Sequence, residues 1–593
     1  MLHLWLHLDD LRMVQCKAAL AAAGALLLFW YWLADQDPRG RRVRDTLLIV
    51  LGIVSCASWW NLGRFHFTGS YIIHYHEFYH YYLGGKYAPE LGYTRLYDCT
   101  LVAEDEYAHP GPRLAQLTIR DLRTNVLVPA APVLAHPEDC KQHFSPERWQ
   151  AFMRDAHFFW TGVSWAKMSD ILQDHGYNAT PVWRLLGGFL ANRVGELTPT
   201  TALRLALIDP VLLLAMMLAI AWALGWRTLC VALLFFGTNF PARYLWTGGA
   251  YLRMDWLLAT IAGICLMKRE RPFSAGLAIG YATLLRIFPG FLVAALILKI
   301  LVASVRARHL VFTTAQRRFL AGAAVAIAVL VPLSSVYTGH DSWRGFIANS
   351  RKHLATPLTN NMGWHTVVAW RPSTQEYLLH DPHALDPYAR WGQAQRDNFH
   401  AMRLVFLAGL VAYLVLLGAA VEPHEDWVAL VLGIGLILFA AQLTCYYFIV
   451  FLGFALLWPG LPRSGTALAL LSFATCEFGL AFPGWDDCYF AISVTYVAFV
   501  LALTAAVAWT ARQRAKTQPG PALPLSPFQR KAGLTSLLTL AMVMSSRLSI
   551  QPPPAAPYID GPHCSQPRPR TPPRSRPHPG AAGGHGRCLA PKH

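Results

Sequence analysis

The sequence predicts an all-α polytopic membrane protein. Hydrophobic residues make up 54% of the 593-residue chain, and charged residues make up only 14%. The charged residues cluster in short segments between long uncharged runs, as is typical of multi-pass membrane proteins. The formal net charge of +17 comes mainly from Lys and Arg beside the apolar runs and in the C-terminal region. Membrane topology therefore accounts for most of this charge without a nucleic-acid partner.

Thirteen apolar runs predict helices, and we expect about 11 to 13 of them to form one transmembrane bundle. Several runs are shorter than the ~20 residues of a perpendicular crossing, so some are expected to be broken, re-entrant or shielded by neighbours. The runs lie near residues 18–34, 45–60, 203–224, 228–240, 252–267, 274–287, 289–303, 319–336, 402–421, 427–442, 445–459, 465–483 and 488–510.

Clusters of Lys and Arg predict the orientation of the bundle. They lie at residues 39–44, 268–271, 306–318 and 512–516, and the positive-inside rule places each on the cytoplasmic side. The N-terminus and two long loops, 61–202 and 337–401, then lie outside. Since both loops share one face of the membrane, we expect the chemistry there.

Three regions follow from this topology. Residues 1–44 are predicted to be an extra N-terminal membrane helix with a basic loop, retained because the flanking charges do not suit a cleavable signal peptide. Residues 45–510 are predicted to be the catalytic membrane domain. Residues 511–593 form a basic, Pro-rich cytoplasmic tail, which has too little apolar surface to fold and is predicted to be disordered.

The segment 71–83 is the most informative part of the chain, because it places the carboxylate Glu77 among the histidines His74, His76 and His80 soon after an apolar run. A partly desolvated carboxylate at a membrane face is a useful general base. The alternative is a surface carboxylate paired with a histidine. We expect the histidines to bind acceptor or phosphate without a cofactor, and a divalent metal held by all three is the alternative.

Charged residues inside apolar runs suggest a phosphate site. Arg286 interrupts a run, at a cost of about 2.5 to 3.5 kcal/mol on insertion scales unless it meets an anion or water. A lipid phosphate is a natural partner, and a snorkelling side chain is the alternative. Pro289 is expected to break the helix just after it. Arg253 and Asp255 begin another run, either as substrate contacts or as a buried ion pair.

The second outer loop combines aromatic, amide and cationic side chains. Lys352, His353, Asn360 and Asn361 lie among tryptophans, a composition that suits sugar recognition by ring stacking and hydrogen bonds. The alternative is anchoring at the membrane interface. In the first loop, Cys99 and Cys140 are expected either to form a disulfide in an oxidising compartment or to remain free thiols.

Two motifs resemble those of GT-C glycosyltransferases, most closely glycosyltransferase family 87. The first is Glu77-Phe78-Tyr79-His80-Tyr81-Tyr82, followed by Gly84-Gly85-Lys86-Tyr87 and by Leu91-Gly92-Tyr93-Thr94-Arg95-Leu96-Tyr97, and the second is Leu285-Arg286-Ile287-Phe288-Pro289. Glu77 stands where Asp is commoner in that family, and Arg286 stands where Lys is common. The resemblance covers roughly residues 45–510 and implies a GT-C-like bundle that transfers sugar with inversion.

We therefore expect a membrane glycosyltransferase that moves a hexose or pentose, such as a mannose-like sugar, from a polyprenyl-phosphate donor to a lipid or glycan acceptor. Its expected location is the outer face of a bacterial inner membrane. Glu77 is the expected catalytic base. The expected substrate-binding residues are His76, His80, Tyr81, Arg95, Tyr97, Arg253, Asp255, Arg286, Lys352, His353, Asn360 and Asn361. The alternatives are a carrier or flippase for lipid-linked sugars and a structural membrane subunit.

Overall fold

The computed structural model describes residues 9–34, 38–67 and 71–517. Within these ranges the fold is all-α, and the β-structure is limited to two antiparallel pairs of short strands. The strands are β1 (Thr118–Asp121) with β2 (Val126–Pro129), and β3 (Asn361–Met362) with β4 (Leu443–Thr444). The last helix extends seven residues beyond the predicted end of the bundle at 510, and the rest of the predicted tail lies outside the described residues.

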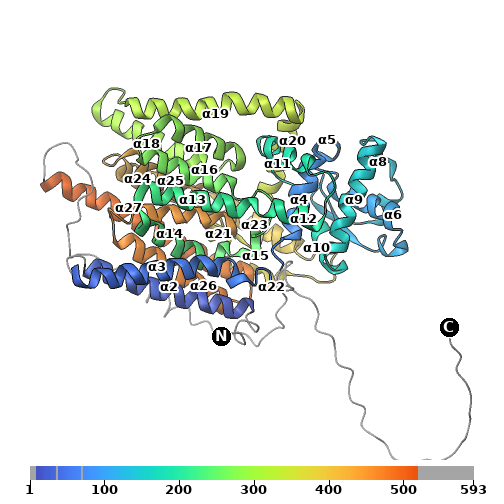
Figure 1. Cartoon of the computed structure of the whole chain (residues 1–593), viewed down its shortest axis with the longest axis horizontal. Helices are drawn as coiled ribbons and strands as arrows, with labels where there is room; N and C mark the ends of the chain where they lie inside the picture. The colour runs from blue at the N-terminus through green and yellow to red at the C-terminus, as the bar shows by residue number, and fades with distance from the viewer. Residues whose placement is uncertain (1–8, 35–37, 68–70, 518–593) are drawn as a thin grey trace, which may run out of the picture. The chain divides into compact units, whose positions relative to one another are not determined.

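All of the predicted apolar runs coincide with helices. Among the described residues, seven helical segments are long and apolar enough to cross a membrane. They are α2 (Asp10–Leu33), α12 with α13 (Pro199–Ala206 and Ile208–Leu224), α18 (Gly290–Ala307), α19 (Thr314–Thr338), α24 (Arg403–Val421), α26 (Arg463–Ala481) and α27 (Trp485–Thr517). The other runs form α3 (Pro38–Trp59), α14 (Trp226–Thr238), α16 (Asp255–Lys268), α17 (Pro272–Arg286), α25 (Asp426–Ala440) and the 3₁₀-helix η5 (Cys445–Leu457). These helices are typical of a multi-pass membrane protein (Figure 1).

The 3₁₀ conformation of η5 gives a short segment a longer reach. A 3₁₀-helix rises ~2.0 Å per residue, against 1.5 Å for an α-helix. The 13 residues of η5 therefore extend over about 26 Å, close to the ~30 Å thickness of the hydrocarbon core. Its Phe448, Phe451 and Leu452 are buried, so its neighbours shield this less regular backbone.

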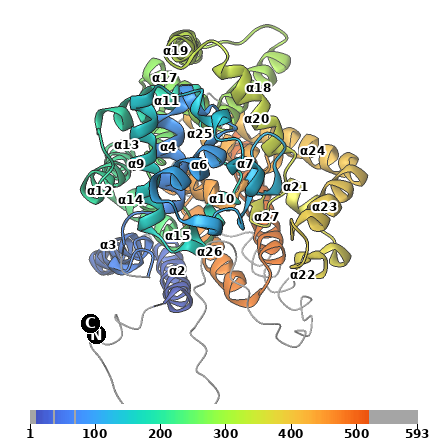
Figure 2. The ribbon, with the colours of Figure 1, turned by 90° about the vertical axis from the view of Figure 1, so that its right-hand side faces the viewer.

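The two predicted outer loops contain many short helices. The first holds α4 (Tyr75–Lys86), α5 (Ala88–Leu91), α6 (Leu96–Ala108), α7 (Ala131–Leu134), α8 (Glu138–Lys141), α9 (Pro146–Gly162), α10 (Trp165–Leu172), α11 (Pro181–Arg193), η1 (Asn61–Gly63) and η2 (Gly111–Arg113). The second holds α20 (Ser342–Leu354), α21 (Trp364–Ala369), η4 (Pro372–Thr374), α22 (Glu376–Leu379) and α23 (Ala389–Ala401). Two further short elements, η3 (Phe240–Ala242) and α15 (Tyr244–Thr247), lie outside both loops, between α14 and α16. Figure 1 shows α4 to α11 gathered beyond one end of the long helices, and Figure 2 views that end directly.

Buried aromatic residues explain why the first outer region folds. Phe152 and Phe159 of α9 are fully buried, and α9 packs against α6 and α4. Tyr82 and Tyr87 also lie in this core, where Tyr87 donates a hydrogen bond to the buried Asp155 carboxylate at 2.8 Å. These side chains belong to a hydrophobic core that is continuous with that of the long helices, and they hold α4 in place at the end of the bundle.

A disulfide joins Cys99 of α6 to Cys140 of α8. We expect alkylation of the denatured, unreduced protein to label two fewer thiols than alkylation after reduction, because a disulfide blocks both of its sulfur atoms. Intact-mass spectrometry of the two samples measures the difference. A Cys99→Ser, Cys140→Ser double variant is the control and should show no difference. Equal labelling of the parent protein would contradict the bond.

Glycines allow α17 and α19 to lie in close contact, as Figure 1 shows. A Cβ atom at Gly276 would lie 1.9 Å from the backbone oxygen of Phe319, and one at Gly322 would lie 2.1 Å from that of Phe273. Neither backbone can yield without separating the two helices. Both positions therefore require glycine.

We expect Gly276→Ala to lower the stability of the bundle by about 1 to 3 kcal/mol, because the added methyl group overpacks the interface. The apparent melting temperature in detergent measures this effect. Gly392→Ala in α23 is the matched control, since its Cβ would meet only the flexible end of Arg396 at 3.6 Å. A melting temperature for Gly276→Ala equal to that of the control would refute the close contact.

Candidate functional site

His74 fixes the start of α4 and thereby the position of Glu77. The Nδ1 atom of His74 accepts a hydrogen bond from the backbone N–H of Glu77 at 3.2 Å, and its Nε2 atom donates to the backbone oxygen of Leu245 at 2.9 Å. The backbone N–H of His74 donates to Gly249 at 3.0 Å. A Cβ atom at Gly249, where φ is +76°, would lie 1.6 Å from the oxygen of Ile72. The helix therefore begins in close contact with the loop that leads to Arg253.

Glu77 forms an ion pair with Arg253. Its Oε2 atom lies 3.0 Å from Nε of Arg253, and the Glu77 side chain is 16% exposed whereas that of Arg253 is 3% exposed. Glu77 is thus a largely buried carboxylate, and its ion-pair partner is an arginine. The ion-pair partner of Arg253 is thus Glu77. The alternative expectation was an ion pair between Arg253 and Asp255.

The hydroxyl group of Tyr81 connects the two predicted arginines. Its oxygen accepts hydrogen bonds from Nη1 of Arg253 and from Nη2 of Arg286, the latter at 3.2 Å. The same hydroxyl donates to Oδ1 of Asn178 at 2.9 Å. Tyr81 follows Glu77 by one helical turn, so both side chains lie on one face of α4. Glu77, Tyr81, Arg253 and Arg286, which were all predicted as site residues, are therefore connected through these contacts.

The topology places both arginines at the same end of the bundle. Asp255 is the first residue of α16 and Arg286 is the last residue of α17, and these consecutive helices pack against each other. Leu252 and Ile287, which flank the two arginines, both have a φ of +50°. Branched residues rarely adopt this conformation, and such strain is concentrated at functional sites. The helix is broken before Pro289, as predicted: α17 ends at Arg286, and α18 begins at Gly290 with Pro289 as its N-cap residue.

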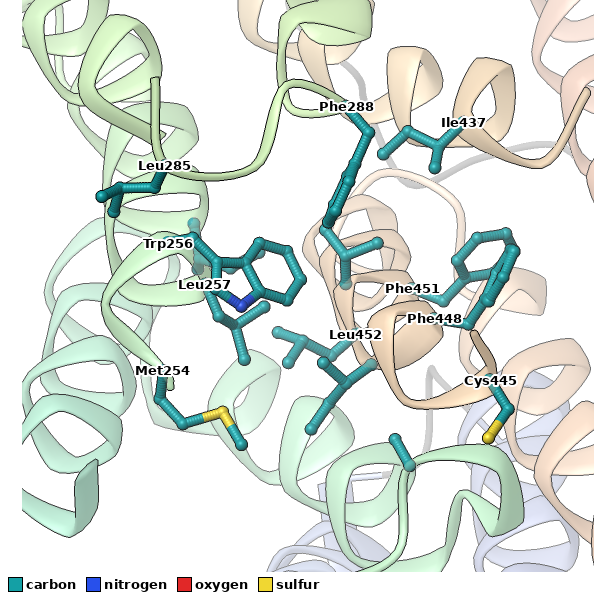
Figure 3. Packing of buried hydrophobic residues seen from close by; sticks show 14 of the residues in the cluster. Met254, Trp256, Leu257, Leu285, Phe288, Ile437, Cys445, Phe448, Phe451 and Leu452 are labelled. Carbon is teal, nitrogen blue, oxygen red and sulfur yellow. The ribbon is translucent and has the colours of Figure 1, made fainter. Parts of the chain in front are cut away.

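Apolar side chains between the charged residues hold these backbone segments in place. Figure 3 shows Trp256 of α16 and Phe288 of the α17–α18 link beside η5, with Leu285 near them. The ring centroids of Trp256 and Phe288 are 5.0 Å apart, and Tyr447 lies 5.1 Å from Phe288. Because Trp256 and Phe288 anchor the chain in the core, Asp255 and Arg286 keep fixed positions.

Three buried polar atoms at this site have no hydrogen-bond partner among the described residues: Nε of Arg253, Oδ2 of Asp255 and Nε of Arg286. Nε of Arg253 takes part in the ion pair with Glu77, and the charge of Asp255 interacts with both Arg286 and Arg253. Buried polar atoms are nearly always satisfied, so exceptions indicate a bound ligand or a catalytic role. We call Glu77, Tyr81, Arg253, Asp255 and Arg286 the carboxylate–arginine group.

A second group lies on the adjacent face of α4. Nε2 of His76 lies 2.9 Å from Oδ2 of Asp174, and Nε2 of His80 lies 3.8 Å from the same oxygen. Nδ1 of His80 donates to the backbone oxygen of His76 at 2.8 Å, and the Tyr97 hydroxyl donates to Nε2 of His80 at 2.6 Å. We call His76, His80, Tyr97 and Asp174 the histidine group.

The electrostatics of the histidine group favour a neutral ring beside an ionised carboxylate. Burial raises the pKa of Asp174, but the hydrogen bond from His76 and the charges of His76 and His80 outweigh burial and hold this pKa well below its ordinary value. Burial lowers the pKa of His76 to about 3, although Asp174 opposes this. At neutral pH His76 is therefore uncharged, and its Nε2–H group donates a hydrogen bond to the Asp174 carboxylate.

His76 and His80 carry a recognisable local signal. The order His76-Glu77-Phe78-Tyr79-His80 is a His-Glu-x-x-His arrangement, which places two imidazoles on one helix face and is typical of zinc sites. His74, the third ligand in the alternative expectation of a metal site, instead caps α4, and the carboxylate of Asp174 lies beside the other two histidines. No local pattern identifies Asp174, because almost a hundred residues separate it from the histidines.

The other predicted residues of the first loop and of α20 lie outside the carboxylate–arginine group. Arg95 donates to the backbone oxygen of Glu90 at 3.3 Å and stabilises the turn before α6. Lys352 donates to the backbone oxygen of Leu122 at 2.5 Å, and burial lowers the pKa of Lys352 to about 8. The contacts of Arg95 and Lys352 are thus structural. The His353 ring centroid lies 6.3 Å from that of His175, the residue that follows Asp174, and burial lowers the pKa of His353 to about 4.

Asn360 and Asn361 form part of the pairing between β3 and β4. Asn361 pairs with Thr444, and the backbone oxygen of Asn360 accepts a hydrogen bond from Cys445 at 2.9 Å. A cavity beside Asn361 measures only about 20 Å³, which is room for about one water molecule. This cavity does not hold a sugar in the present conformation. The pairing does, however, position the neighbouring Tyr446, whose ring lies 5.6 Å from the Arg253 guanidinium.

An apolar cavity of about 220 Å³ adjoins the carboxylate–arginine group. Asp209 lines it and also accepts hydrogen bonds from the backbone N–H of Arg253, at 2.9 Å to each carboxylate oxygen, and from that of Met254 at 3.1 Å. The other lining residues are Trp59, Trp60, Phe65, Ile72, Ala206, Leu207, Pro210, Leu213, Tyr244, Thr247, Gly249 and Met254. Asp209, Asn178 and Tyr446 were not predicted, because only the tertiary fold brings them to the site.

Comparison with protein-family models, curated proteins and solved structures finds no match to this chain.

Proposed function

We propose that this protein is a membrane glycosyltransferase that moves a hexose or pentose from a polyprenyl-phosphate donor to a lipid or glycan acceptor. The observation that supports this proposal most strongly is that Glu77 pairs with Arg253, while Arg253 and Arg286 both donate to the Tyr81 hydroxyl. One carboxylate and two arginines provide the base and the cations that transfer from a lipid phosphate needs. Neither nucleotide nor cofactor is required.

In the proposed reaction, the acceptor hydroxyl attacks the anomeric carbon from the side opposite to the phosphate. Glu77 takes the hydroxyl proton as the new glycosidic bond forms. The bond between the anomeric carbon and the phosphate oxygen breaks, and its electron pair leaves with the polyprenyl phosphate. Arg286 holds this phosphate and stabilises its charge, with Arg253 beside it. The product therefore has the inverted configuration.

Arg253 orients Glu77 before the acceptor binds. Its guanidinium contacts the Glu77 carboxylate at 3.0 Å and also lies 4.2 Å from the centroid of the Tyr81 ring. This double contact fixes one carboxylate oxygen, so the other can face the acceptor. Arg286 retains an unpartnered Nε atom within the described part of the chain, which suits a phosphate oxygen.

The neighbouring apolar cavity supports a lipid-linked donor. It shares Asp209 and Met254 with the backbone that holds Arg253, and its remaining lining is mainly aromatic and aliphatic. The first isoprene units of a polyprenyl chain match this lining. We further propose a GT-C-like arrangement of the helices, with the site at the outer face of a bacterial inner membrane.

Transfer of labelled sugar tests this proposal. Purified full-length protein in lipid nanodiscs is incubated with radiolabelled polyprenyl-phosphate hexoses and pentoses and a membrane-lipid extract as acceptor. We expect label to enter a new lipid or glycan product with at least one donor. If every donor is bound but none is consumed, the protein is a carrier. If none is bound, the proposed donor class is wrong.

A further inference from the structure

The histidine group has the composition and spacing of a metal site. One ring nitrogen of His76, one ring nitrogen of His80 and one carboxylate oxygen of Asp174 all lie within 4.8 Å of one another. Zinc binds imidazole nitrogen and carboxylate oxygen at ~2.0 to 2.2 Å, so the ligand atoms of a tetrahedral site lie about 3.3 Å apart. The separations of 2.9 Å and 3.8 Å from Asp174 Oδ2 lie on either side of this value.

The surrounding hydrogen bonds prepare His80 for coordination. Its Nδ1 atom donates to the backbone oxygen of His76 at 2.8 Å, so Nε2 carries the lone pair, which accepts the hydrogen bond from Tyr97 and lies 3.8 Å from Oδ2 of Asp174. Metal-binding histidines characteristically donate their other N–H group to a backbone carbonyl or a carboxylate in this way. The hydrogen bond to the backbone oxygen of His76 therefore fixes both the orientation of the His80 ring and its tautomer.

Tyr97 is placed to complete the surroundings of such an ion. Its hydroxyl donates to Nε2 of His80 at 2.6 Å and accepts a hydrogen bond from the backbone N–H of Gly176 at 3.0 Å. When a metal occupies the Nε2 lone pair, the Tyr97 hydroxyl is free to donate to a water molecule in the fourth coordination position. Three protein ligands and one water are the usual number for an open zinc site.

From this geometry we propose that His76, His80 and Asp174 bind one divalent transition-metal ion of the zinc class. The proton on Nε2 of His76 moves to Nδ1 when the ion binds, so the ring stays neutral. The ion joins α4 to the segment between α10 and α11. It therefore positions the helix that also carries Glu77 and Tyr81, and this inference is independent of the proposed glycosyl transfer.

The same motif in zinc proteases uses its glutamate to activate the metal-bound water. Here the Glu77 carboxylate is held by Arg253 at 3.0 Å, on the face of α4 that carries Tyr81. The histidines lie on the adjacent face, so the two groups are separate. We therefore assign the ion a positioning role for α4, without peptide hydrolysis at Glu77.

Metal binding to the purified full-length protein tests the proposal. The protein is prepared without a histidine tag, stripped with EDTA, loaded with Zn²⁺ in competition with a chromophoric chelator, and analysed for metal by mass spectrometry. Loading with Co²⁺ gives a second readout, the visible absorption of a tetrahedral site. We expect one tightly bound ion per chain and a Co²⁺ spectrum with tetrahedral intensity.

Variants then locate the bound ion. Asp174→Asn and His80→Gln should each weaken Zn²⁺ binding by at least about 100-fold, above the ~10- to 100-fold effect of losing an outer partner. His157→Gln is the matched control, because His157 forms a similar pair with Glu104 at 3.0 Å but without a second histidine. The Cys99–Cys140 disulfide, detected by thiol labelling, reports whether each variant has folded.

Two results would overturn the metal site. One is less than about one-tenth of an ion per chain in folded parent protein under saturating Zn²⁺. The other is Asp174→Asn protein that is folded and binds Zn²⁺ as tightly as His157→Gln. Because neither measurement involves a sugar donor, failure of the glycosyltransferase proposal leaves both of them interpretable.

Discussion

Glu77→Gln is expected to lower the rate of sugar transfer by ~100-fold or more, because the amide cannot accept the proton of the acceptor hydroxyl. Gln preserves the size of the side chain and keeps an oxygen atom facing Arg253, which forms an ion pair with Glu77 at 3.0 Å in the parent protein. Donor binding should therefore change little. The two quantities are measured separately, as single-turnover transfer of radiolabel and as equilibrium binding of the labelled donor in nanodiscs.

Two further variants separate chemistry from folding. Glu90→Gln is the matched control, because Glu90 is also a largely buried carboxylate paired with an arginine, at 2.6 Å from Nε of Arg148, but lies outside the carboxylate–arginine group. It should transfer sugar at close to the parental rate. Glu77→Asp keeps a carboxylate that can accept the proton of the acceptor hydroxyl, so it should retain measurable transfer.

A parental transfer rate in Glu77→Gln would show that Glu77 is not the base. If the protein moves lipid-linked sugars across a membrane without consuming them, both the parent protein and Glu77→Gln should do so equally. Such a result would favour a carrier, which needs cations to bind its substrate but no general base. The variant therefore distinguishes the two activities.

Much of the helical framework follows from the sequence, because apolar runs must form helices to satisfy their backbone groups in a membrane. The break at Pro289 also follows from local chemistry, since proline cannot continue a helix. Arg286 ends α17 there, as expected. In contrast, the 3₁₀ conformation of η5 depends on the space between its neighbours, which a hydropathy pattern does not encode.

The carboxylate–arginine group could be assembled from the sequence only in part. Glu77 and Arg286 stand out because a charge beside or inside an apolar run must have a partner. Tyr81, which contacts Arg253 and Arg286, belongs to the predicted motif, but its hydrogen bonds depend on how α4 meets the ends of α16 and α17. The ion pair between Glu77 and Arg253 spans 176 positions, so no local pattern reveals it.

Residues of the second outer loop show the opposite case. Lys352 and Asn361 have side chains suited to sugars, yet Lys352 binds the backbone of Leu122 and Asn361 belongs to a β-pair. Composition alone does not distinguish a ligand-binding amide from one that supports a fold. Asp174 shows the reverse: nothing in the sequence around it predicts a role, yet the fold brings its carboxylate to His76 and His80.

Arg286→Ala is expected to weaken binding of the polyprenyl-phosphate donor by about 10- to 150-fold. This range corresponds to the ~1.5 to 3 kcal/mol of a hydrogen bond to a charged group. Arg286 is buried, and its Nε atom has no hydrogen-bond partner in the described ranges. A phosphate oxygen would supply the hydrogen bond that the buried Nε–H group cannot form with water. The transfer rate at saturating donor should fall less than it does in Glu77→Gln.

Matched substitutions identify the role of the Arg286 guanidinium. Arg306→Ala removes an exposed arginine of α18 that pairs with Glu422 at 2.7 Å, and it should leave donor binding unchanged. Arg286→Lys keeps the charge but loses the planar guanidinium, so it should bind the donor with intermediate affinity. If Arg286→Ala binds the donor as tightly as Arg306→Ala does, Arg286 does not contact the phosphate. The buried Arg253, which shares the Tyr81 hydroxyl with Arg286, would then be the remaining cation of the group able to hold it.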